Sequence, residues 1–201
     1  MFSDIVFPKD NEKKLINMAL RLGYSNLYLI YDSKENFNNE TLEKLKDKDI
    51  TVKLGVKTDI KNINKVRKKI NFTLIEASDK IRYIIEKSKP SLIYNLELVG
   101  KKDFIHHRNS SLNQILCKIA NKNKVTVGMN FNNFLKETKL SKDIIIGRIK
   151  QNIKLCRKYK VKMLIASFAS SPYEMHNPQD LLSFLIILGM HPKEAKDSLN
   201  Y

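Results

Sequence analysis

Tryptophan is absent from the 201-residue sequence, and cysteine and glycine are scarce. The two cysteines, Cys117 and Cys156, belong to no CxxC or Cys/His cluster, which argues against a zinc-finger type of site. The six glycines are too far apart for a GxGxxG or Walker-type phosphate loop, and no GxSxG nucleophile elbow is present. These absences exclude the common dinucleotide-binding and serine-hydrolase chemistries.

Long apolar runs are also missing, since none approaches the roughly 18 residues that suggest a membrane-spanning helix. The first residues lack the basic-then-apolar order of a signal peptide. The composition, 42% apolar and 29% charged, is that of an ordinary globular protein. We expect a soluble, cytoplasmic protein with no membrane partner and a single domain over residues 1–201.

Negative charge is under-represented: 37 Lys and Arg stand against 21 Asp and Glu, for a net charge of +16. A surplus of this size points to a polyanionic partner, with nucleic acid as the first choice. Because 31 of the 37 basic residues are lysine, an A/T-rich genome and solvated lysines on every surface are an alternative explanation.

Short apolar runs alternate with amphipathic helical patterns along the whole chain. Most runs are nearly continuous, as parallel strands covered on both faces require. The pattern predicts an α/β fold, an irregular TIM-like (β/α) barrel of about seven parallel strands, with an open doubly wound sheet as the alternative. The predicted strands are Ile5–Phe7, Leu27–Tyr31, Ile50–Val56, Phe72–Ile75, Leu92–Leu96, Val125–Phe131 and Val161–Phe168.

The residues needed for metal catalysis do not converge in the sequence. His106 and His107 are adjacent, so a regular strand would turn their rings to opposite faces. Only Asp4 lies near the first predicted strand, where a metal-dependent barrel hydrolase would hold several ligands. We therefore expect no catalytic residue and no metal site in this chain.

Polar and basic side chains do gather after the predicted strands, the end at which (β/α) barrels carry their functional groups. Arginine, lysine and the free N–H groups of helix N-termini are well suited to phosphate. Each serine or asparagine alone is better explained as a helix cap, but the whole set together with the positive charge favours phosphate binding. The predicted RNA contacts are Lys57, Arg82, Arg108, Asn109, Ser170 and Ser171, with Arg157 and Lys158 as a second, weaker patch.

The predicted helix Gln179–Leu188 is apolar nearly all round, after an Asn177-Pro178 start. Such a helix is either buried on several sides or part of an interface. For the interface alternative we select Leu182, Leu185 and Ile186 as the residues that contact a partner protein.

Two blocks of the sequence, His107–Phe131 and Ile165–Lys196, resemble the thirty-kilodalton protein subunit family of ribonuclease P, known in archaea as ribonuclease P protein component 3. The first is His107–Phe131, HRNSSLNQILCKIANKNKVTVGMNF, which is similar to a family pattern of an arginine loop followed by sxLNxxLcxxAxxNxVxxGxxF. The second is Ile165–Lys196, which resembles the family's ending. The opening Phe2–Pro8 and the pair Asp79 and Arg82 resemble it more loosely. One departure is His176, which stands near the place where the family usually carries an arginine.

This resemblance implies a barrel related to the polymerase-and-histidinol-phosphatase fold, with the metal ligands lost. It implies a non-catalytic subunit of the ribonucleoprotein that removes 5′ leaders from precursor tRNA, with an archaeal source. The expected partners are the ribonuclease P RNA, the small ferredoxin-like subunit, other ribonuclease P proteins and precursor tRNA. The protein would bind no cofactor, and the RNA subunit would use Mg²⁺ for the hydrolysis.

Two enzymatic hypotheses stay open beside this one. A metal-dependent phosphoesterase of the same barrel superfamily would need about six His, Asp or Glu ligands at strand ends. A barrel enzyme for a small phosphorylated ligand would use the same serine and arginine loops, and would show no salt-dependent affinity for RNA.

Overall fold

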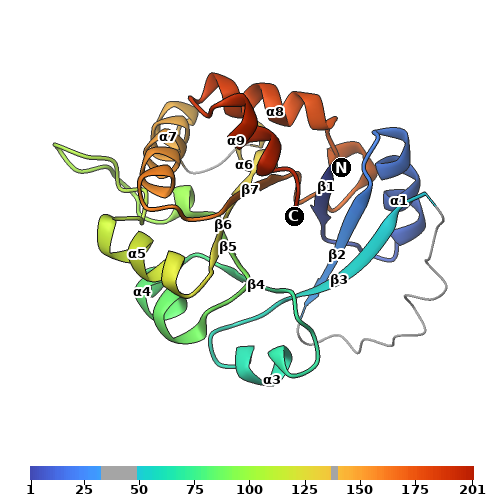
Figure 1. The fold of residues 1–201 in the computed structure, drawn as a ribbon, viewed down its shortest axis with the longest axis horizontal. Coiled ribbons are helices and arrows are strands. Elements are labelled where there is room, and N and C mark those ends of the chain that lie inside the picture. Colours follow the sequence, from blue (N-terminus) through green and yellow to red (C-terminus); the bar gives the residue numbers. More distant parts are fainter. Residues whose placement is uncertain (33–48, 137–139) are drawn as a thin grey trace.

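Seven parallel strands lie side by side in chain order and curve into a barrel (Figure 1). The computed structural model describes residues 1–32, 49–136 and 140–201. All seven predicted strands are confirmed within a few residues, and the barrel is favoured over the open sheet. The strands are β1 Ser3–Val6, β2 Asn26–Asp32, β3 Thr51–Lys57, β4 Thr73–Glu76, β5 Leu92–Tyr94, β6 Thr126–Asn130 and β7 Met163–Ala166.

The helices lie around the outside of the barrel (Figure 1). They are α1 Glu12–Arg21, α3 Ile63–Arg67, α4 Ile81–Tyr83, α5 Gln114–Lys122, α6 Phe131–Leu135, α7 Lys142–Lys158, α8 Pro178–Ile187 and α9 Pro192–Asp197. A π-helical turn, Ile84–Ser88, continues α4. Asn177 caps α8 as predicted, through a hydrogen bond from the Gln179 N–H to its side chain. Among the described residues, no helix is both long and apolar enough to cross a membrane.

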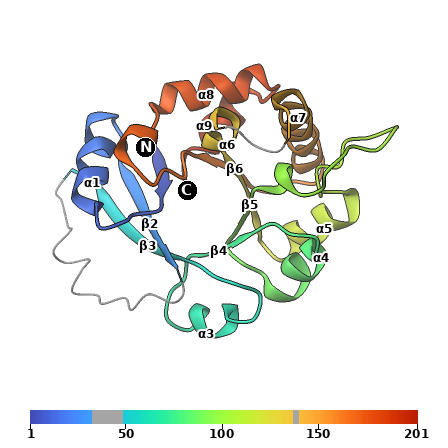
Figure 2. The same cartoon turned by 180° about the vertical axis from the view of Figure 1, so that it is seen from behind.

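The barrel is closed between β1 and β7 by the end of the chain rather than by a full strand ladder. The C-terminal residues follow α9 into this gap, where the Ser3 N–H donates to the Leu199 carbonyl at 2.8 Å and the Ile165 N–H donates to the Ser198 carbonyl at 3.1 Å. At the other end of the gap the Phe7 N–H donates to the Ala169 carbonyl at 2.8 Å. The two termini therefore lie next to each other (Figures 1 and 2).

Six aromatic side chains help to fill the interior of the barrel. Phe7, Tyr94 and Phe168 pack together near the carboxyl ends of the strands, with ring centroids 5.0–6.1 Å apart. Tyr28 lies toward the amino ends, with the Phe72 and Tyr201 rings at 4.6 and 5.4 Å. Small residues on the strands make room for them.

Gly55 of β3 is the clearest example of a small residue that leaves space for an aromatic ring. A Cβ atom there would lie 2.5 Å from Ile30 and 2.8 Å from the Phe72 ring. The neighbouring residues of β3 with the same side-chain direction are Lys53 and Lys57, since side chains alternate along a strand. Their ammonium groups lie over aromatic rings at the two ends of the barrel, Lys53 at 5.0 Å from the Tyr28 centroid and Lys57 at 5.9 Å from that of Tyr94.

Candidate nucleic-acid interface

Six of the eight predicted contact residues lie at the carboxyl-terminal end of the barrel. Lys57 is the last residue of β3, and Arg82 lies in α4, which follows β4. The other four are Arg108 and Asn109 between β5 and α5, and Ser170 and Ser171 after β7. Parallel strands bring these connections to one face, as the sequence predicts.

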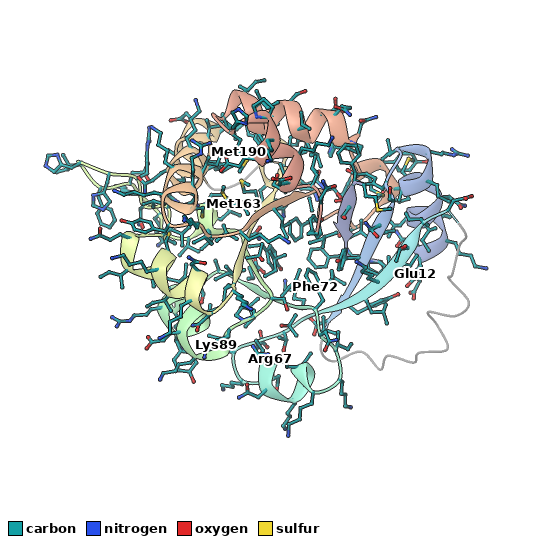
Figure 3. The ribbon with its side chains drawn as sticks, viewed as in Figure 1. Glu12, Arg67, Phe72, Lys89, Met163 and Met190 are labelled. Atoms are coloured by element: carbon teal, nitrogen blue, oxygen red, sulfur yellow. The ribbon has the colours of Figure 1, made fainter. Side chains whose placement is uncertain are left out.

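A groove of about 1090 Å³ brings Lys57 and Arg82 together. One wall is the connection from β3 to α3, and the other is α4 with its π-helical turn. Arg67 of α3 spans the two, because its guanidinium donates to the carbonyls of Ser88 and Lys89 (Figure 3). The charged side chains that line the groove are Lys57, Lys61, Lys80, Arg82 and Lys87, with Asp59, Glu76 and Glu86.

The two predicted cations of the groove are paired with carboxylates, and three others are not. Lys57 Nζ lies 2.9 Å from Glu76 Oε2, and Arg82 Nε lies 3.4 Å from Glu86 Oε2. The lysines at 61, 80 and 87 are exposed, and no ion pair engages them within residues 1–32, 49–136 and 140–201. Because five cations face three anions, the groove is positively charged and its spare charge comes from these three lysines.

The Lys57 ammonium group lies over the aromatic rings at the carboxyl-terminal mouth of the barrel. Its ammonium group lies 6.0 Å from the Phe7 ring centroid and 5.9 Å from that of Tyr94. Burial lowers the pKa of Lys57, but the Tyr94 hydroxyl and the Glu76 carboxylate outweigh it and raise the pKa above its ordinary value. Burial raises the pKa of Tyr94 to about 12. Lys57 is therefore a fixed cation, and aromatic rings occupy the space beneath it.

A chain of amide groups continues from Glu76 across this mouth. Asn95 donates from Nδ2 to Glu76 Oε1 at 2.8 Å, and its Oδ1 accepts from Asn133 Nδ2 at 2.7 Å. Asn133 also reaches Glu97 Oε1 at 3.4 Å. Burial raises the pKa of Glu97 to about 7. Within the described part of the chain, no three His, Cys, Asp or Glu side chains converge in a metal-binding arrangement.

Asp4, the acidic residue of the first strand, has its carboxylate engaged in the closure of the barrel. Its two oxygens accept from the N–H and the hydroxyl of Ser167, each at 2.7 Å, which joins β1 to the segment after β7. Burial raises the pKa of Asp4 to about 6, against the lowering effect of these hydrogen bonds. This carboxylate is completely buried and does not face the groove.

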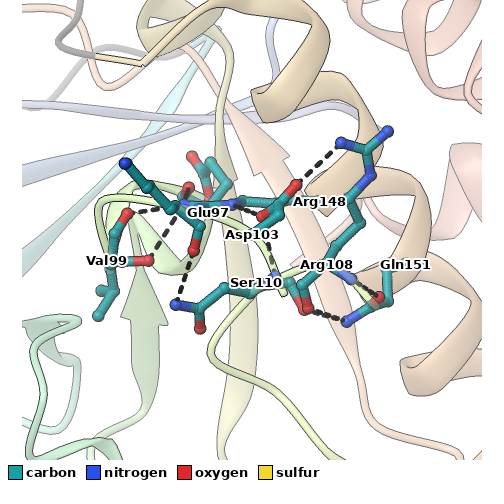
Figure 4. Close-up of polar contacts among 10 residues, drawn as sticks. Glu97, Val99, Asp103, Arg108, Ser110, Arg148 and Gln151 are labelled. Atoms are coloured by element: carbon teal, nitrogen blue, oxygen red, sulfur yellow. Dashed lines mark hydrogen bonds and ion pairs between the residues drawn. The ribbon is translucent and has the colours of Figure 1, made fainter. Parts of the chain in front are cut away.

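Arg108 and Asn109 are held at the base of a long loop between β5 and α5 (Figure 4). Arg108 Nη1 lies 2.8 Å from Asp103 Oδ2, and the Asn109 N–H donates to Asp103 Oδ1 at 2.9 Å. Gln151 of α7 pairs with the Arg108 main chain through two hydrogen bonds of 3.0 and 3.1 Å. Asp103 therefore orients Arg108, whose guanidinium is half exposed.

Of the two serines after β7, Ser171 has the helix-capping role that the sequence left open, whereas Ser170 takes part through its main chain. The Ser170 N–H donates to Glu174 Oε2 at 2.7 Å, and the Ser171 hydroxyl accepts from the Tyr173 N–H at 3.4 Å. Glu174 in turn lies 2.7 Å from Lys136 Nζ. A carboxylate thus stands where a phosphate would approach these serines, so their contact with RNA stays a prediction that this geometry does not favour.

The second predicted patch lies at the opposite end of the barrel, where α7 ends before β7. Arg157 Nη2 lies 2.6 Å from Glu194 Oε2 and donates to the Gly189 carbonyl at 2.7 Å, so it joins α7 to α8 and α9. Lys158 is exposed beside it. Neither residue shares a face with the groove, and any contact with RNA there would be a separate one.

His176 is the residue that the resemblance puts near the usual arginine of the family. Its ring lies edge-on to Phe131 at 4.7 Å and its Nε2 lies 3.2 Å from Asn132 Oδ1. Burial lowers the pKa of His176, against the raising effects of Asp180 and Glu174. The histidine therefore packs as a neutral side chain rather than serving as a cation.

The predicted protein interface on α8 is partly wrong. Leu185 is completely buried against the barrel, so it is unavailable to a partner. Leu182 is partly buried, Ile186 is 37% exposed, and Ile187, which the prediction omitted, is 76% exposed. The reason is that an all-apolar helix gives no sign in sequence of which face packs inward. Leu181 and Leu185 take the inner face.

The sequence interpretation missed Arg148 and the three groove lysines. Arg148 lies in α7 between the buried residues Ile145 and Asn152, and a basic residue within an apolar stripe is the signal that would have found it. Lys61, Lys80 and Lys87 resemble the other 28 lysines, so only their positions in space distinguish them.

Comparison with known proteins places these features in a family. The family model described as RNase P subunit p30 matches residues 100–201. Ribonuclease P protein component 3 of Methanococcus maripaludis strain C6 is 31% identical over 160 residues, which cover 75% of this chain and 66% of that protein. The protein of the same name from Methanocaldococcus jannaschii is 27% identical over 184 residues, which cover 85% of this chain and 76% of that one.

Solved structures share the fold. A chain in the cryo-EM structure of archaeal ribonuclease P with mature tRNA superposes with a TM-score of 0.80 at 24% identity, covering 98% of this chain and 86% of that chain. A. niger ochratoxinase superposes with a TM-score of 0.59 at 8% identity, covering 98% of this chain and 69% of its own. Because the family model matches just over half of the sequence, this chain belongs to the RNase P subunit p30 family.

Proposed function

We propose that this chain is a non-catalytic, RNA-binding protein subunit of ribonuclease P, the ribonucleoprotein that removes 5′ leaders from precursor tRNA. Its role is electrostatic. Lysine and arginine side chains neutralise phosphates that the folded RNA brings close together, which lowers the Mg²⁺ concentration that the active RNA structure needs. The hydrolysis itself belongs to the RNA subunit and its Mg²⁺.

The observation that carries this proposal is the groove between the β3–α3 connection and α4. It is about 1090 Å³ in volume, and its excess charge comes from lysines that form no ion pair with any residue that the structure describes. Cations without carboxylate partners release the counterions of phosphate at no cost in broken ion pairs. Family membership and the net charge of +16 support the same role.

The alternative, a metal-dependent phosphoesterase, is not favoured by what fills the barrel mouth. The Phe7, Tyr94 and Phe168 rings and the Lys57 ammonium group occupy the region where a barrel enzyme holds substrate and metal. A fixed cation there would repel a metal ion. The nearest carboxylates, Glu76 and Glu97, are each hydrogen-bonded to asparagine amides instead.

The proposed partners are the ribonuclease P RNA, the small ferredoxin-like subunit, other ribonuclease P proteins, and precursor tRNA within the complex. The exposed part of α8, around Ile186 and Ile187, is available to a protein partner. The RNA contacts that the geometry supports best are Lys57, Arg82, Arg108 and Asn109, together with the groove lysines.

The test is cleavage of precursor tRNA by the matching ribonuclease P RNA across a Mg²⁺ titration, with and without this protein and its small partner. We expect cleavage at lower Mg²⁺ only when the protein pair is present, and none without RNA. Cleavage by the protein alone would overturn the non-catalytic role. An unchanged Mg²⁺ dependence, with active controls, would overturn the subunit role.

Arg108→Ala makes the same test for one residue. Its guanidinium is exposed and is oriented by Asp103, so we expect lower activity mainly at limiting Mg²⁺. Equal activity of the variant and the wild-type protein at every Mg²⁺ concentration would remove Arg108 from the interface.

A further inference from the structure

The segment Gly100–Asn109, here called the finger, projects away from the barrel between β5 and α5. It is the light green loop that extends furthest from the strands in Figure 1. A long excursion of this kind on a compact fold is usually functional when it is held in one conformation. The base of the finger is held by buried polar contacts, whereas its tip is exposed.

The base of the finger is fixed by Arg148, whose side chain is completely buried in α7. Arg148 Nε lies 2.8 Å from Asp103 Oδ1, and its Nη1 donates to the carbonyls of Glu97, Val99 and Gly100 at 2.8–3.1 Å (Figure 4). A buried arginine with four such partners specifies the course of the backbone that enters the finger.

The tip of the finger, Phe104–His107, is exposed and carries two large apolar side chains beside two histidines. Phe104 is 57% exposed and Ile105 is 95% exposed, although the rest of the molecule buries most of its large apolar side chains. The Phe104 and His107 rings stack at 4.6 Å with an angle of 28°, and the Phe104 N–H donates to the His107 carbonyl at 3.1 Å. The two rings are thus already stacked on each other and exposed to solvent.

Cations surround this tip. Lys101 and Lys102 are exposed on one side of it and Arg108 on the other. Asp103, the acidic residue of the finger, is engaged by Arg108 and Arg148, and these partners outweigh burial and lower its pKa to about 2. Aromatic rings set among cations are the combination that binds unpaired nucleotides, since bases stack on the rings and phosphates meet the lysines.

We propose that the finger tip binds an unstacked base of structured RNA. The base stacks on the Phe104–His107 pair, Ile105 packs against the same nucleotide, and Lys101 and Lys102 contact the flanking phosphates. The proposal rests on the proposed function, which supplies the RNA, and adds a recognition mode to the electrostatic groove. A paired duplex offers no free base face, so the tip distinguishes unpaired from paired RNA.

The first measurement is the affinity of the protein with its small partner for the matching ribonuclease P RNA. Because stacking of one base on aromatic rings contributes on the order of a ten-fold factor in affinity, we expect the double substitution Phe104→Ala with His107→Ala to weaken binding about ten-fold. The slope of log affinity against log salt should not change, since no phosphate contact is lost. Phe104→Trp should retain the wild-type affinity.

Tyr173→Ala is the matched control, because Tyr173 is 91% exposed in the short 3₁₀ helix Pro172–Glu174 after β7. We expect it to leave affinity unchanged, and urea unfolding should show all variants folded. If the wild-type protein binds the RNA and the Phe104/His107 variant binds equally well, the tip proposal is overturned while the proposed function stands. If the wild-type protein itself does not bind, the proposed function fails first.

Cross-linking identifies what occupies the tip. A benzophenone amino acid at position 104 in the assembled particle should cross-link to the RNA, at nucleotides that are unpaired. Cross-links to double-stranded nucleotides, or to a protein subunit alone, would overturn the proposal and assign the tip to backbone or protein contact.

Discussion

The Arg148 guanidinium and the Asp103 carboxylate form an ion pair of 2.8 Å across the boundary between α7 and the finger. The arginine side chain is completely buried, and the aspartate side chain is 15% exposed. Because the same carboxylate also binds Arg108, one buried residue on a helix sets the position of an exposed cation on a loop. The stability of the fold and the shape of its surface are coupled here.

We expect Arg148→Ala to lower the free energy of unfolding by about 3 kcal/mol or more, measured by urea denaturation. The substitution removes the donor that three carbonyls share and one of the partners of the Asp103 carboxylate, and breaking a buried pair on one side is costly. Arg157→Ala is the control: its pair with Glu194 is half exposed, so its cost should stay below about 1 kcal/mol. Equal costs for the two variants would contradict a structural role for Arg148.

Asp4 gives the protein an unusual dependence of stability on pH. Its pKa is about 6 in the folded state, above the ordinary value of 3.8, so between these pH values the folded chain holds a proton that the unfolded chain releases. The free energy of unfolding therefore falls as pH rises from about 4 to about 6, by about 3 kcal/mol from this group. Glu97, with a pKa of about 7, adds a further decrease in the free energy of unfolding over a similar pH range.

The variant Asp4→Asn stays neutral, and its amide can replace the protonated carboxyl beside Ser167. We expect wild-type stability to approach that of the variant near pH 4 and to fall below it at pH 7. Ser167→Ala removes hydrogen bonding that lowers the Asp4 pKa, so it should extend the fall to higher pH. Parallel curves of unfolding free energy against pH for the wild-type protein and Asp4→Asn would show that Asp4 does not titrate in this way.

The groove lysines are tested by substitution with glutamine, a neutral polar side chain. We expect Lys61→Gln with Lys80→Gln to weaken RNA binding and to reduce the salt slope by about two, since each lost phosphate contact removes roughly one. The control is Lys122→Gln with Lys124→Gln, which removes the same charge at the opposite end of the barrel. Equal losses in both variants would mean that net charge, and not the groove, determines binding.

The fold was largely predictable because strands and helices follow from local patterns. A continuous apolar run such as Leu27–Tyr31 indicates a strand covered on both faces, and β2 matches it. Helix starts were predictable where a cap is explicit, as at Asn177. At α1 the start is less explicit, because Asp10 has a φ of +54° and its neighbour Asn11 takes the N-cap position.

The candidate site was less predictable because its interacting side chains lie far apart in the sequence. Cys117 and Cys156 are both buried, and nothing in the sequence indicated that their thiols contact each other between α5 and α7. The contact of Asp4 with Ser167 joins opposite ends of the chain in the same way. The barrel determines which of these distant residues come into contact. The arrangement of the strands must therefore be known before such contacts can be predicted.

The apolar helix α8 has a buried face and an exposed face, and one substitution on each face tests this assignment. Leu185→Ala should cost about 3 kcal/mol of unfolding free energy, because it opens a cavity beneath a completely buried side chain. Ile187→Ser should cost less than about 0.5 kcal/mol, since Ile187 is 76% exposed. Both are measured by urea denaturation of the isolated protein. If Ile187→Ser were as damaging as Leu185→Ala, the outer face of α8 would be packed against the chain itself, and it would not be available to a partner.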